Sequence, residues 1–464
     1  MTSYAEVVLN APAADAAHPA FSKMFVQTEW AADAGALLAR RRPRAPDEPS
    51  CWLVHALAGD APTAGTVQRE TDRARFIGRG HTLAAPRALV EPEPLSGTVG
   101  NVLDPIVSLR GMVELAAGGE AHITFLLGAA ADRTAALALA ARYDSPTAVA
   151  TAFQAAASKH PLPDPVFLPV GERRPTPLAP ADDAVPGPTA PPADDEPLQF
   201  WNGHGGFSAD GCEYVIRIRP DVGGRPLLPP QPWTNVIANP RFGFIASETG
   251  AGYTWSQNSR ENRLTPWYND PVLDPHGEAL YLRDEDGGAV WSPLPGPIPQ
   301  PVAYEVRHGF GYSRYRHASR GLEQDVCLFV PREDPLKLAL IRLHNPSRRP
   351  RRLSLFGYAR LVLGVLPTDY AAALAVTRDP ATGALFAESH NREFAGRIAF
   401  AALAAPADAP IRFSGDRLAF LGRHGNPAGP AALYRDATLD GRLGPGLDPC
   451  FALQATFEIA PGAT

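Results

Sequence analysis

The sequence contains an internal repeat, which means that one structural unit must occur twice in the chain. Residues 72–120 align without a gap to residues 416–464, and 19 of the 49 positions are identical. The most similar stretch, DRARFIGR at 72–79, returns as DRLAFLGR at 416–423. A weaker repeat relates residues 4–9 to residues 358–363. Segments this similar should form the same supersecondary unit, so the fold is built around a duplication.

The repeat does not cover the whole of either part of the chain. Residues 4–120 correspond only to about 358–464, and nothing before Tyr4 corresponds to 198–357. The first copy continues through ITFLL at 123–127 into a helical stretch, whereas the second stops at Thr464. We therefore expect an internal piece of a longer protein, or the product of a shortened reading frame, in which the first strands lack some of their partners.

A proline-rich segment separates the two parts. Residues 161–197 hold 12 prolines in 37 positions and two acidic clusters, a composition typical of a semi-rigid spacer. We therefore divide the chain into a partial β-sandwich at 1–130, a helical segment at 131–160, a linker at 161–197 and a larger sandwich at 198–464.

Hydrophobic patterning predicts the fold class. Alternating runs such as 214–218, 326–330 and 338–343 are separated by turn residues at short intervals, which is typical of antiparallel β-structure. Residues 132–158 are alanine-rich and are interrupted by Asp-Ser-Pro at 144–146, which predicts two short helices. The expected fold is mainly β: a large antiparallel β-supersandwich preceded by a partial duplicate with a short helical segment.

Composition excludes several classes of protein. A net charge of −6, with 45% hydrophobic and 20% charged residues, excludes wholesale disorder and gives no field that would hold a nucleic acid. Cys51, Cys212, Cys327 and Cys450 are far apart, so we expect neither a zinc site nor a disulfide framework. No apolar run is long enough for a membrane helix, and the first residues do not form a signal-peptide pattern. These patterns favour a cytoplasmic chain without membrane contact of its own.

The densest group of functional-looking residues lies at 250–278. Aromatic rings alternate there with amides and charged groups, a mixture that suits sugars because a pyranose has apolar faces and many hydroxyls. The competing interpretation is a polar loop whose aromatic rings fill the core. The candidate contacts are Tyr253, Trp255, Asn258, Asn262, Arg263, Trp267, Asn269 and Asp270.

No other segment predicts a catalytic centre. The glycine-rich stretch at 200–207 matches no nucleotide-binding spacing and is better interpreted as a tight turn before a strand, with His204 structural. Hydrolysis would need a pair of carboxylates, and the sequence offers Asp270 with Asp274 or Asp284 with Glu285. Nothing beyond their presence marks either pair as catalytic. The sequence has no GxSxG motif for a serine nucleophile. We therefore assign no catalytic residue, no metal and no cofactor.

Long motifs in the second part resemble a known family. FWNGHGGFSADGCEYVI at 200–216, PWTNVIANPRFGFIASETGAGYTWSQNSRENRLTPWYNDP at 232–271 and HGFGYSRYRH at 308–317 resemble the N-terminal β-sandwich of glycoside hydrolase family 94, formerly glycosyltransferase family 36. That family contains disaccharide phosphorylases and cyclic β-1,2-glucan synthases. The duplicated arrangement is most similar to the synthase branch of the family.

The resemblance implies a fold and a role. It implies a β-supersandwich that is joined by helices to an (α/α)₆ barrel carrying the catalytic Asp, and this barrel is absent from the chain. It also implies a homodimer, a β-glucan or glucooligosaccharide as ligand, inorganic phosphate as a co-substrate of the full-length parent, and possible anchoring of that parent at the inner membrane. Gly252, Tyr253, Arg263, Leu264 and Thr265 match a family loop that reaches into the active site. Arg263 is therefore the leading sugar contact, although Asn262 replaces a basic residue that is common in the phosphorylases.

Three functional hypotheses remain open from the sequence. The first is a carbohydrate-contacting sandwich of a glucan-processing enzyme, without catalytic activity of its own. The second is a structural or dimerisation scaffold for the parent enzyme that does not bind sugar independently. The third, and weakest, is a self-sufficient lyase or hydrolase carried by the sandwich.

Overall fold

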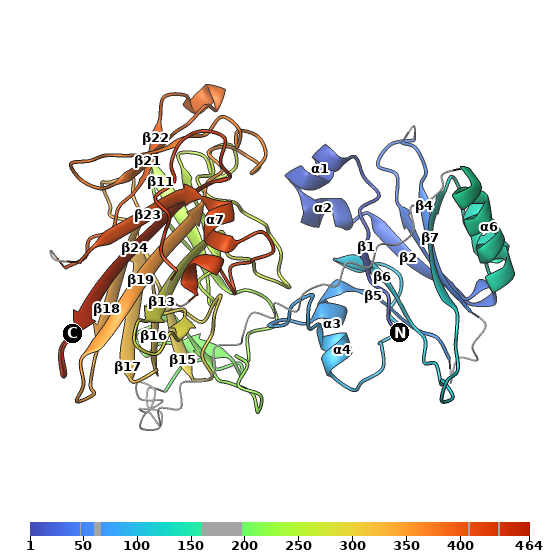
Figure 1. The fold of residues 1–464 in the computed structure, drawn as a ribbon, viewed down its shortest axis with the longest axis horizontal. Helices are drawn as coiled ribbons and strands as arrows, with labels where there is room; N and C mark the ends of the chain where they lie inside the picture. The colour runs from blue at the N-terminus through green and yellow to red at the C-terminus, as the bar shows by residue number, and fades with distance from the viewer. Residues whose placement is uncertain (47, 60–65, 160–196, 407–408, 435–436) are drawn as a thin grey trace. The chain divides into compact units, whose positions relative to one another are not determined.

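The chain folds into two compact, mainly β units, Met1–Arg173 and Arg174–Thr464 (Figure 1). The computed structural model describes residues 1–46, 48–59, 66–159, 197–406, 409–434 and 437–464. The sheets are antiparallel throughout the described strand pairs, which confirms the predicted fold class. The predicted linker at 161–197 lies almost entirely outside the described residues.

The described residues of the first unit form seven strands and several short helices. Its strands are β1 (Ala5–Glu6), β2 (Val26–Ala31), β3 (Ala36–Arg41), β4 (Trp52–Gly59), β5 (Gln68–Asp72), β6 (Pro105–Arg110) and β7 (Ile123–Ala130). Its helices are α1 (Pro12–Ala17), α2 (Pro19–Lys23), the 3-10 turn η1 (Ala32–Ala34), α3 (Arg73–Ile77), α4 (Arg87–Val90), α5 (Arg133–Arg142) and α6 (Pro146–Lys159).

Two sheets and one helix form three layers in the first unit. The sheet β1-β6-β5 packs on the sheet β2-β3-β4-β7 through a core that includes Val26, Leu37 and Leu109. The opposite face of the four-stranded sheet packs on α5 through Ala136 and Ala140. The two predicted helices are confirmed as α5 and α6. Asp132 caps α5 by accepting a hydrogen bond from the backbone of Ala135.

The second unit is dominated by strands. They are β8 (Gly205–Phe207), β9 (Glu213–Ile218), β10 (Thr234–Asn239), β11 (Phe242–Ser247), β12 (Gly252–Ser256), β13 (Glu278–Asp284), β14 (Val290–Trp291), β15 (Tyr304–Gly309), β16 (Tyr312–Ser319), β17 (Leu322–Phe329), β18 (Leu338–His344), β19 (Arg351–Arg360), β20 (Val376–Arg378), β21 (Leu385–Glu388), β22 (Ile398–Ala401), β23 (Ile411–Asp416) and β24 (Pro449–Ile459). The helical elements are η2 (Arg392–Phe394), α7 (Arg417–Leu421) and η3 (Ala431–Leu433).

Two large sheets make the sandwich of the second unit. The six-stranded sheet β18-β17-β16-β15-β9-β8 packs on the five-stranded sheet β14-β13-β19-β24-β23 through a core that includes Trp291, Leu343 and Leu355. The sheet β10-β11-β12 covers the rest of the six-stranded sheet, with Phe244 in the shared core. The sheet β20-β21-β22 packs against the end of β24 near Leu453.

The repeat in the sequence has the same backbone pairing in both copies. β5 pairs with β6 through Arg69↔Leu109, with a bulge before Asp72. β23 pairs with β24 through Phe413↔Leu453, with a bulge at the same place, before Asp416. β1 and β19 then lie in equivalent positions beside β6 and β24. β19 also pairs with β13 on its other side, whereas β1 is an edge strand among the described residues. β13 therefore has no counterpart among the described residues of the first unit.

Side chains around the bulge repeat as well. Asp72 caps α3, and Asp416 caps α7, by accepting backbone hydrogen bonds. The arginine after each cap forms an ion pair with the aspartate that precedes the returning strand, Arg73 with Asp104 and Arg417 with Asp448. On the other face of the sheet, Tyr4 meets Phe76 at 4.9 Å between ring centroids, and their counterparts Tyr358 and Phe420 stack at 4.7 Å.

The core of each copy is also built in the same way. Six buried residues of the first unit each have an apolar counterpart in the second unit at the same position of the same strand or adjoining turn. In the first unit they are Val7, Val26, Leu37, Ala39, Val107 and Leu109, and in the second they are Leu361, Leu374, Leu385, Ala387, Phe451 and Leu453. The duplication is therefore a duplication of packing as well as of sequence.

The described residues contain no helix long and apolar enough to cross a bilayer. All four cysteines are free thiols, in agreement with their spacing in the sequence. Burial raises the pKa of the Cys450 thiol, which lies fully inside the core against Tyr358 and Ala452.

Two histidines, His317 buried and His308 partly buried, should make the second unit less stable in mild acid. Burial lowers the pKa of His317 to about 3 and that of His308 to about 4. Both are neutral in the folded chain at pH values where the unfolded chain, with a pKa of 6.5, already takes up protons. The free energy of unfolding should therefore fall as the pH is lowered from about 6.5 to about 4.5, by about 1.4 kcal/mol per pH unit for each histidine.

Urea unfolding between pH 7 and 4.5 measures this slope. His317→Leu should reduce the change in the free energy of unfolding per pH unit by the contribution of one histidine. His424→Leu, at an exposed position, is the matched control. An unchanged slope in His317→Leu would show that the buried ring does not control the acid response.

Candidate functional site

The segment predicted to contact sugar comprises β12 and the long loop between β12 and β13. Two bridges hold it in place, because Arg263 pairs with Trp255 on one side and with Gly364 on the other. The backbone of Arg263 donates to and accepts from Gly364 at 3.0 and 3.1 Å. The loop is thus fixed between its own strand and the segment that follows β19, about 100 residues away in the sequence.

Three aromatic rings from this region lie against one another. The ring of Tyr253 is 5.2 Å from Trp255 and 5.0 Å from Trp267, in both cases tilted. Tyr253 is the buried centre of the group, only 6% exposed, whereas both tryptophans are partly exposed. The hydroxyl of Tyr253 donates to the carbonyl of Ser259 at 3.2 Å, which ties the rings to the loop. The exposed part of this cluster is an apolar surface of the kind on which a pyranose stacks.

Arg263 holds the loop from inside. Its side chain is 7% exposed and donates to the carbonyls of Ser259 and Val365 at 3.4 and 3.2 Å. Its guanidinium lies 5.8 Å from the centre of the Tyr253 ring, close enough for a cation–π contact. Burial lowers the pKa of Arg263. This residue joins the aromatic cluster to residues 363–365 and so positions the loop.

The amides divide into exposed and internal groups. Asn258 is exposed, and its side-chain oxygen accepts from the backbones of Arg260 and Glu261, both at 2.9 Å. Asn262 is 2% exposed and donates to the carbonyl of Ser256 at 3.0 Å, while its side-chain oxygen has no hydrogen-bond partner among the described residues. Asn391, from the turn before η2, donates to the carbonyl of Glu261 at 2.8 Å.

Backbone strain concentrates in the same loop. Gln257, Asn269 and Asp274 have positive φ values of 62°, 47° and 45°. Leu363, in the segment after β19 that pairs with the loop (the receiving segment), has a φ of 46°. A residue with a side chain is held in this region at a cost of about 1–2 kcal/mol, and such residues cluster at ligand sites. Asn269 is exposed, and Asp270 beside it accepts from the backbones of Val272 and Leu273.

An ion pair supports the base of the loop. Glu278, the first residue of β13, binds the ammonium of Lys337 at 2.7 Å. Its other oxygen accepts from the hydroxyls of Thr254 and Thr265, so that both ends of the loop meet at one carboxylate. Burial alone would raise the pKa of Glu278, but Lys337 and the two hydroxyls outweigh it and the pKa is lowered.

The structure therefore places Tyr253 and Trp255 on β12 and the other six predicted residues in the loop that follows it, but the eight have different surroundings. Trp255, Asn258, Trp267, Asn269 and Asp270 keep some exposed surface, whereas Tyr253, Asn262 and Arg263 are buried. The sequence analysis missed Glu278, the last residue of the predicted segment, and the partners that come from distant segments: Gly364, Val365, Asn391 and Lys337. Neighbouring residues give no pattern by which these could have been found.

The other candidate segments have structural roles. Residues 202–205 form a tight turn that leads into β8, with the side-chain oxygen of Asn202 accepting from the backbones of His204 and Gly205. Asp284 binds Arg351 at 2.6 Å, and Glu285 binds Arg283 at 2.8 Å. No group of three or more metal-ligating side chains occurs among the described residues.

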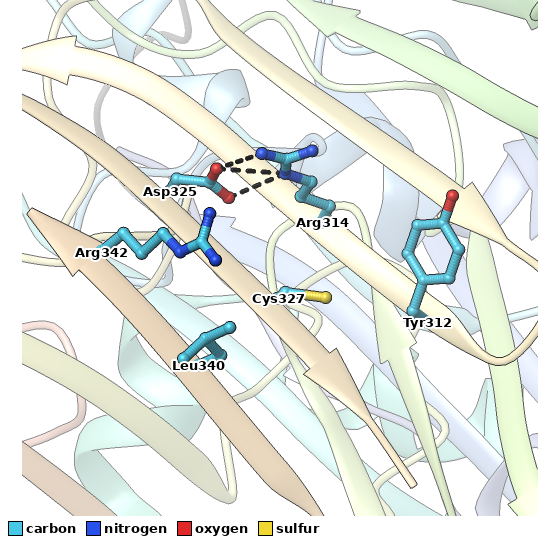
Figure 2. Close-up of a pocket in the computed structure, with 6 residues that line it drawn as sticks. All are labelled: Tyr312, Arg314, Asp325, Cys327, Leu340 and Arg342. Carbon is cyan, nitrogen blue, oxygen red and sulfur yellow. Dashed lines mark hydrogen bonds and ion pairs between the residues drawn. The ribbon is translucent and has the colours of Figure 1, made fainter. Parts of the chain in front are cut away.

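A separate pocket of about 310 Å³ lies on the outer face of the six-stranded sheet (Figure 2). It spans β16, β17 and β18, and the loop contributes none of the side chains that define it. Arg314 donates to both oxygens of Asp325, at 2.9 and 3.1 Å. The guanidinium of Arg342 points into the same space, and burial raises the pKa of the Cys327 thiol there. The remaining lining residues are Tyr312 and Leu340.

With this fold and loop established, comparison with known proteins identifies the family. The family described as "Glycosyl hydrolase 94, supersandwich domain" matches residues 1–146 and 213–464, and the chain belongs to that family. The match covers most of both units.

Several characterised relatives are similar to the chain. Cyclic beta-(1,2)-glucan synthase NdvB of Rhizobium meliloti is 29% identical over the full chain, which spans 22% of that protein. N,N'-diacetylchitobiose phosphorylase of Vibrio furnissii is 30% identical over 56% of the chain and 32% of its own length. Solabiose phosphorylase of Paenibacillus borealis is 26% identical over 56% of the chain and 33% of its own length. The chain thus spans a third or less of the length of these relatives.

Removing the ion pair at the base of the loop should destabilise the second unit. Lys337→Met leaves the Glu278 carboxylate without its cation, so we expect the free energy of unfolding to fall by about 1–3 kcal/mol. Adding Glu278→Gln should restore part of this loss, because no unpaired charge then remains. Urea unfolding of the two single variants and the double variant measures the coupling, and strictly additive losses would contradict the role given to this pair.

Proposed function

We propose that the chain is the carbohydrate-contacting β-sandwich portion of a glucan-processing enzyme similar to cyclic β-1,2-glucan synthase. In this proposal it does not catalyse a reaction alone, because the (α/α)₆ barrel implied by the family resemblance supplies the catalytic acid. The parent would use inorganic phosphate, and the chain would act in the cytoplasm as part of a homodimer. The chain itself would contribute the contact with the glucan.

The observation that carries the proposal is the loop between β12 and β13. Together with Trp255 near the end of β12, it combines a partly exposed face that includes Trp267 with exposed amides at Asn258 and Asn269. Its backbone is held in strained conformations by long-range contacts, and such rigidity reduces the entropy lost when a ligand binds. Arg263 would act in this arrangement as a positioning residue for the aromatic surface, and its buried guanidinium would not stack on the sugar itself.

Calorimetric titration of the full chain with linear β-1,2-glucooligosaccharides tests the proposal. We expect selective binding compared with cellooligosaccharides, and a loss of at least about tenfold in affinity for Trp267→Ala. Trp201→Ala removes a 48%-exposed tryptophan from another part of the unit and is the matched control. Equal affinity of the unsubstituted chain and Trp267→Ala would show that the loop does not contact the sugar.

A second candidate function is a structural scaffold that binds no sugar alone. The burial of Tyr253, Asn262 and Arg263 favours it, because these residues now support the loop from within. A folded chain that binds neither oligosaccharide would support this alternative. Binding that is lost in Arg342→Ala but kept in Trp267→Ala would instead move the sugar to the pocket on the six-stranded sheet.

A further inference from the structure

The sheet β20-β21-β22 has an open edge and an uncovered apolar face among the described residues. β22 is its last strand, and no described strand pairs with its outer edge. Ala399 and Ala401 pack inward, whereas Ile398 and Phe400 point to the other face and are 60% and 53% exposed. Two large apolar side chains exposed on one short edge strand indicate a surface that pairs with something.

The first unit contains the same surface in a covered form. Thr28 bridges Gly100 as Val376 bridges Gly444, which makes β2 the counterpart of β20. The registers Ala39↔Leu53 and Ala387↔Ala399 then make β4 the counterpart of β22. Val54 therefore corresponds to Phe400, and Trp52 corresponds to Ile398.

The difference in exposure at these positions is large. Val54 is 0% exposed, whereas Phe400 is 53% exposed. Two elements account for the burial of Val54. β7 pairs with β4 over its whole length, from Trp52↔Ala130 to Gly59↔Ile123, and α5 covers the face with Ala136 and Ala140.

The position of the second copy's last residues fits the same arrangement. β7 enters its sheet opposite Gly59, the last residue of β4. In the second copy, Leu403 follows β22 and packs in the same core cluster as Ala463. Asn345 fixes this end by accepting from Gly462 and donating to Ala463, at 2.8 and 2.9 Å. The residues that follow β22 and those that follow β24 therefore border the same core cluster.

We propose that the outer edge of β22 and the face around Phe400 are the docking surface for a strand–helix unit of the β7–α5 design, joined in the same polypeptide beyond β24. The strand would add antiparallel to β22, by the backbone pairing that β7 makes with β4. The helix would cover Ile398 and Phe400 with small side chains, as the alanines of α5 cover Val54. This inference is independent of the proposed contact with sugar.

The full chain extended after Thr464 by a second copy of its own residues 121–159 tests the docking surface. The repeat aligns Thr464 with Glu120, so this extension reproduces the spacing of the first copy. We expect amide exchange in residues 396–404 to slow by at least about tenfold and the melting temperature of the second unit to rise by about 5 °C. A helical extension that leaves exchange in this segment unchanged would overturn the proposal.

Matched substitutions separate docking from ordinary instability. In the unextended chain, Phe400→Asp should change the melting temperature by no more than about 1 °C, whereas Val54→Asp should strongly lower that of the first unit. In the extended chain, Phe400→Asp should abolish the added protection. Equal damage from Phe400→Asp and Val54→Asp in the unextended chain would contradict an open surface. Concentration-dependent protection of β22 in the unextended chain would identify a second copy as the occupant and would also overturn the proposal.

Discussion

The bulged pairing of β23 with β24 is the constraint on which the rest of the second unit depends. The bulge turns the chain at Asp416, so that this side chain caps α7 and Arg417 reaches Asp448. It thereby fixes which residues of β24 face the core around Leu453 and which face the rings of Tyr358 and Phe420. The same pairing, cap and ion pair recur around Asp72, so this geometry is a property of the repeated sequence and does not depend on its surroundings.

The candidate site needs this repeated unit and also the part of the sandwich that is not repeated. The segment after β19 receives the loop at Leu363 and Gly364, and its counterpart in the first unit is Leu9 and Asn10. Leu9 has the same unusual backbone conformation, with φ of 45° against 46° at Leu363. In the first unit the side chain of Asn10 donates to Ser22. The receiving segment is therefore present twice, whereas the loop with its aromatic cluster belongs to the second unit.

Much of the fold could be predicted from the sequence, because its signals are local. The period-two runs gave β9, β17 and β18, Asp-Ser-Pro at 144–146 separated α5 from α6, and the repeat predicted equivalent units. The sequence predicted which segment forms the candidate site, but not how its side chains are arranged. Arg263 was expected to face a ligand, yet carbonyls from Ser259 and Val365 hold its side chain inside. Contacts between residues about 100 positions apart depend on tertiary packing, which periodicity and composition do not encode. The docking surface at Phe400 was missed for the same reason, because exposure depends on what covers a strand.

Hydrogen-exchange mapping of the full chain with and without a linear β-1,2-glucooligosaccharide tests the central claim most directly. If the loop between β12 and β13 contacts the glucan, protection should appear at residues 257–277 and in the receiving segment at 363–366. The outer face of β16, β17 and β18 should exchange at an unchanged rate. Protection confined to residues 312–342, or none in a folded chain at a saturating concentration of the oligosaccharide, would contradict the account.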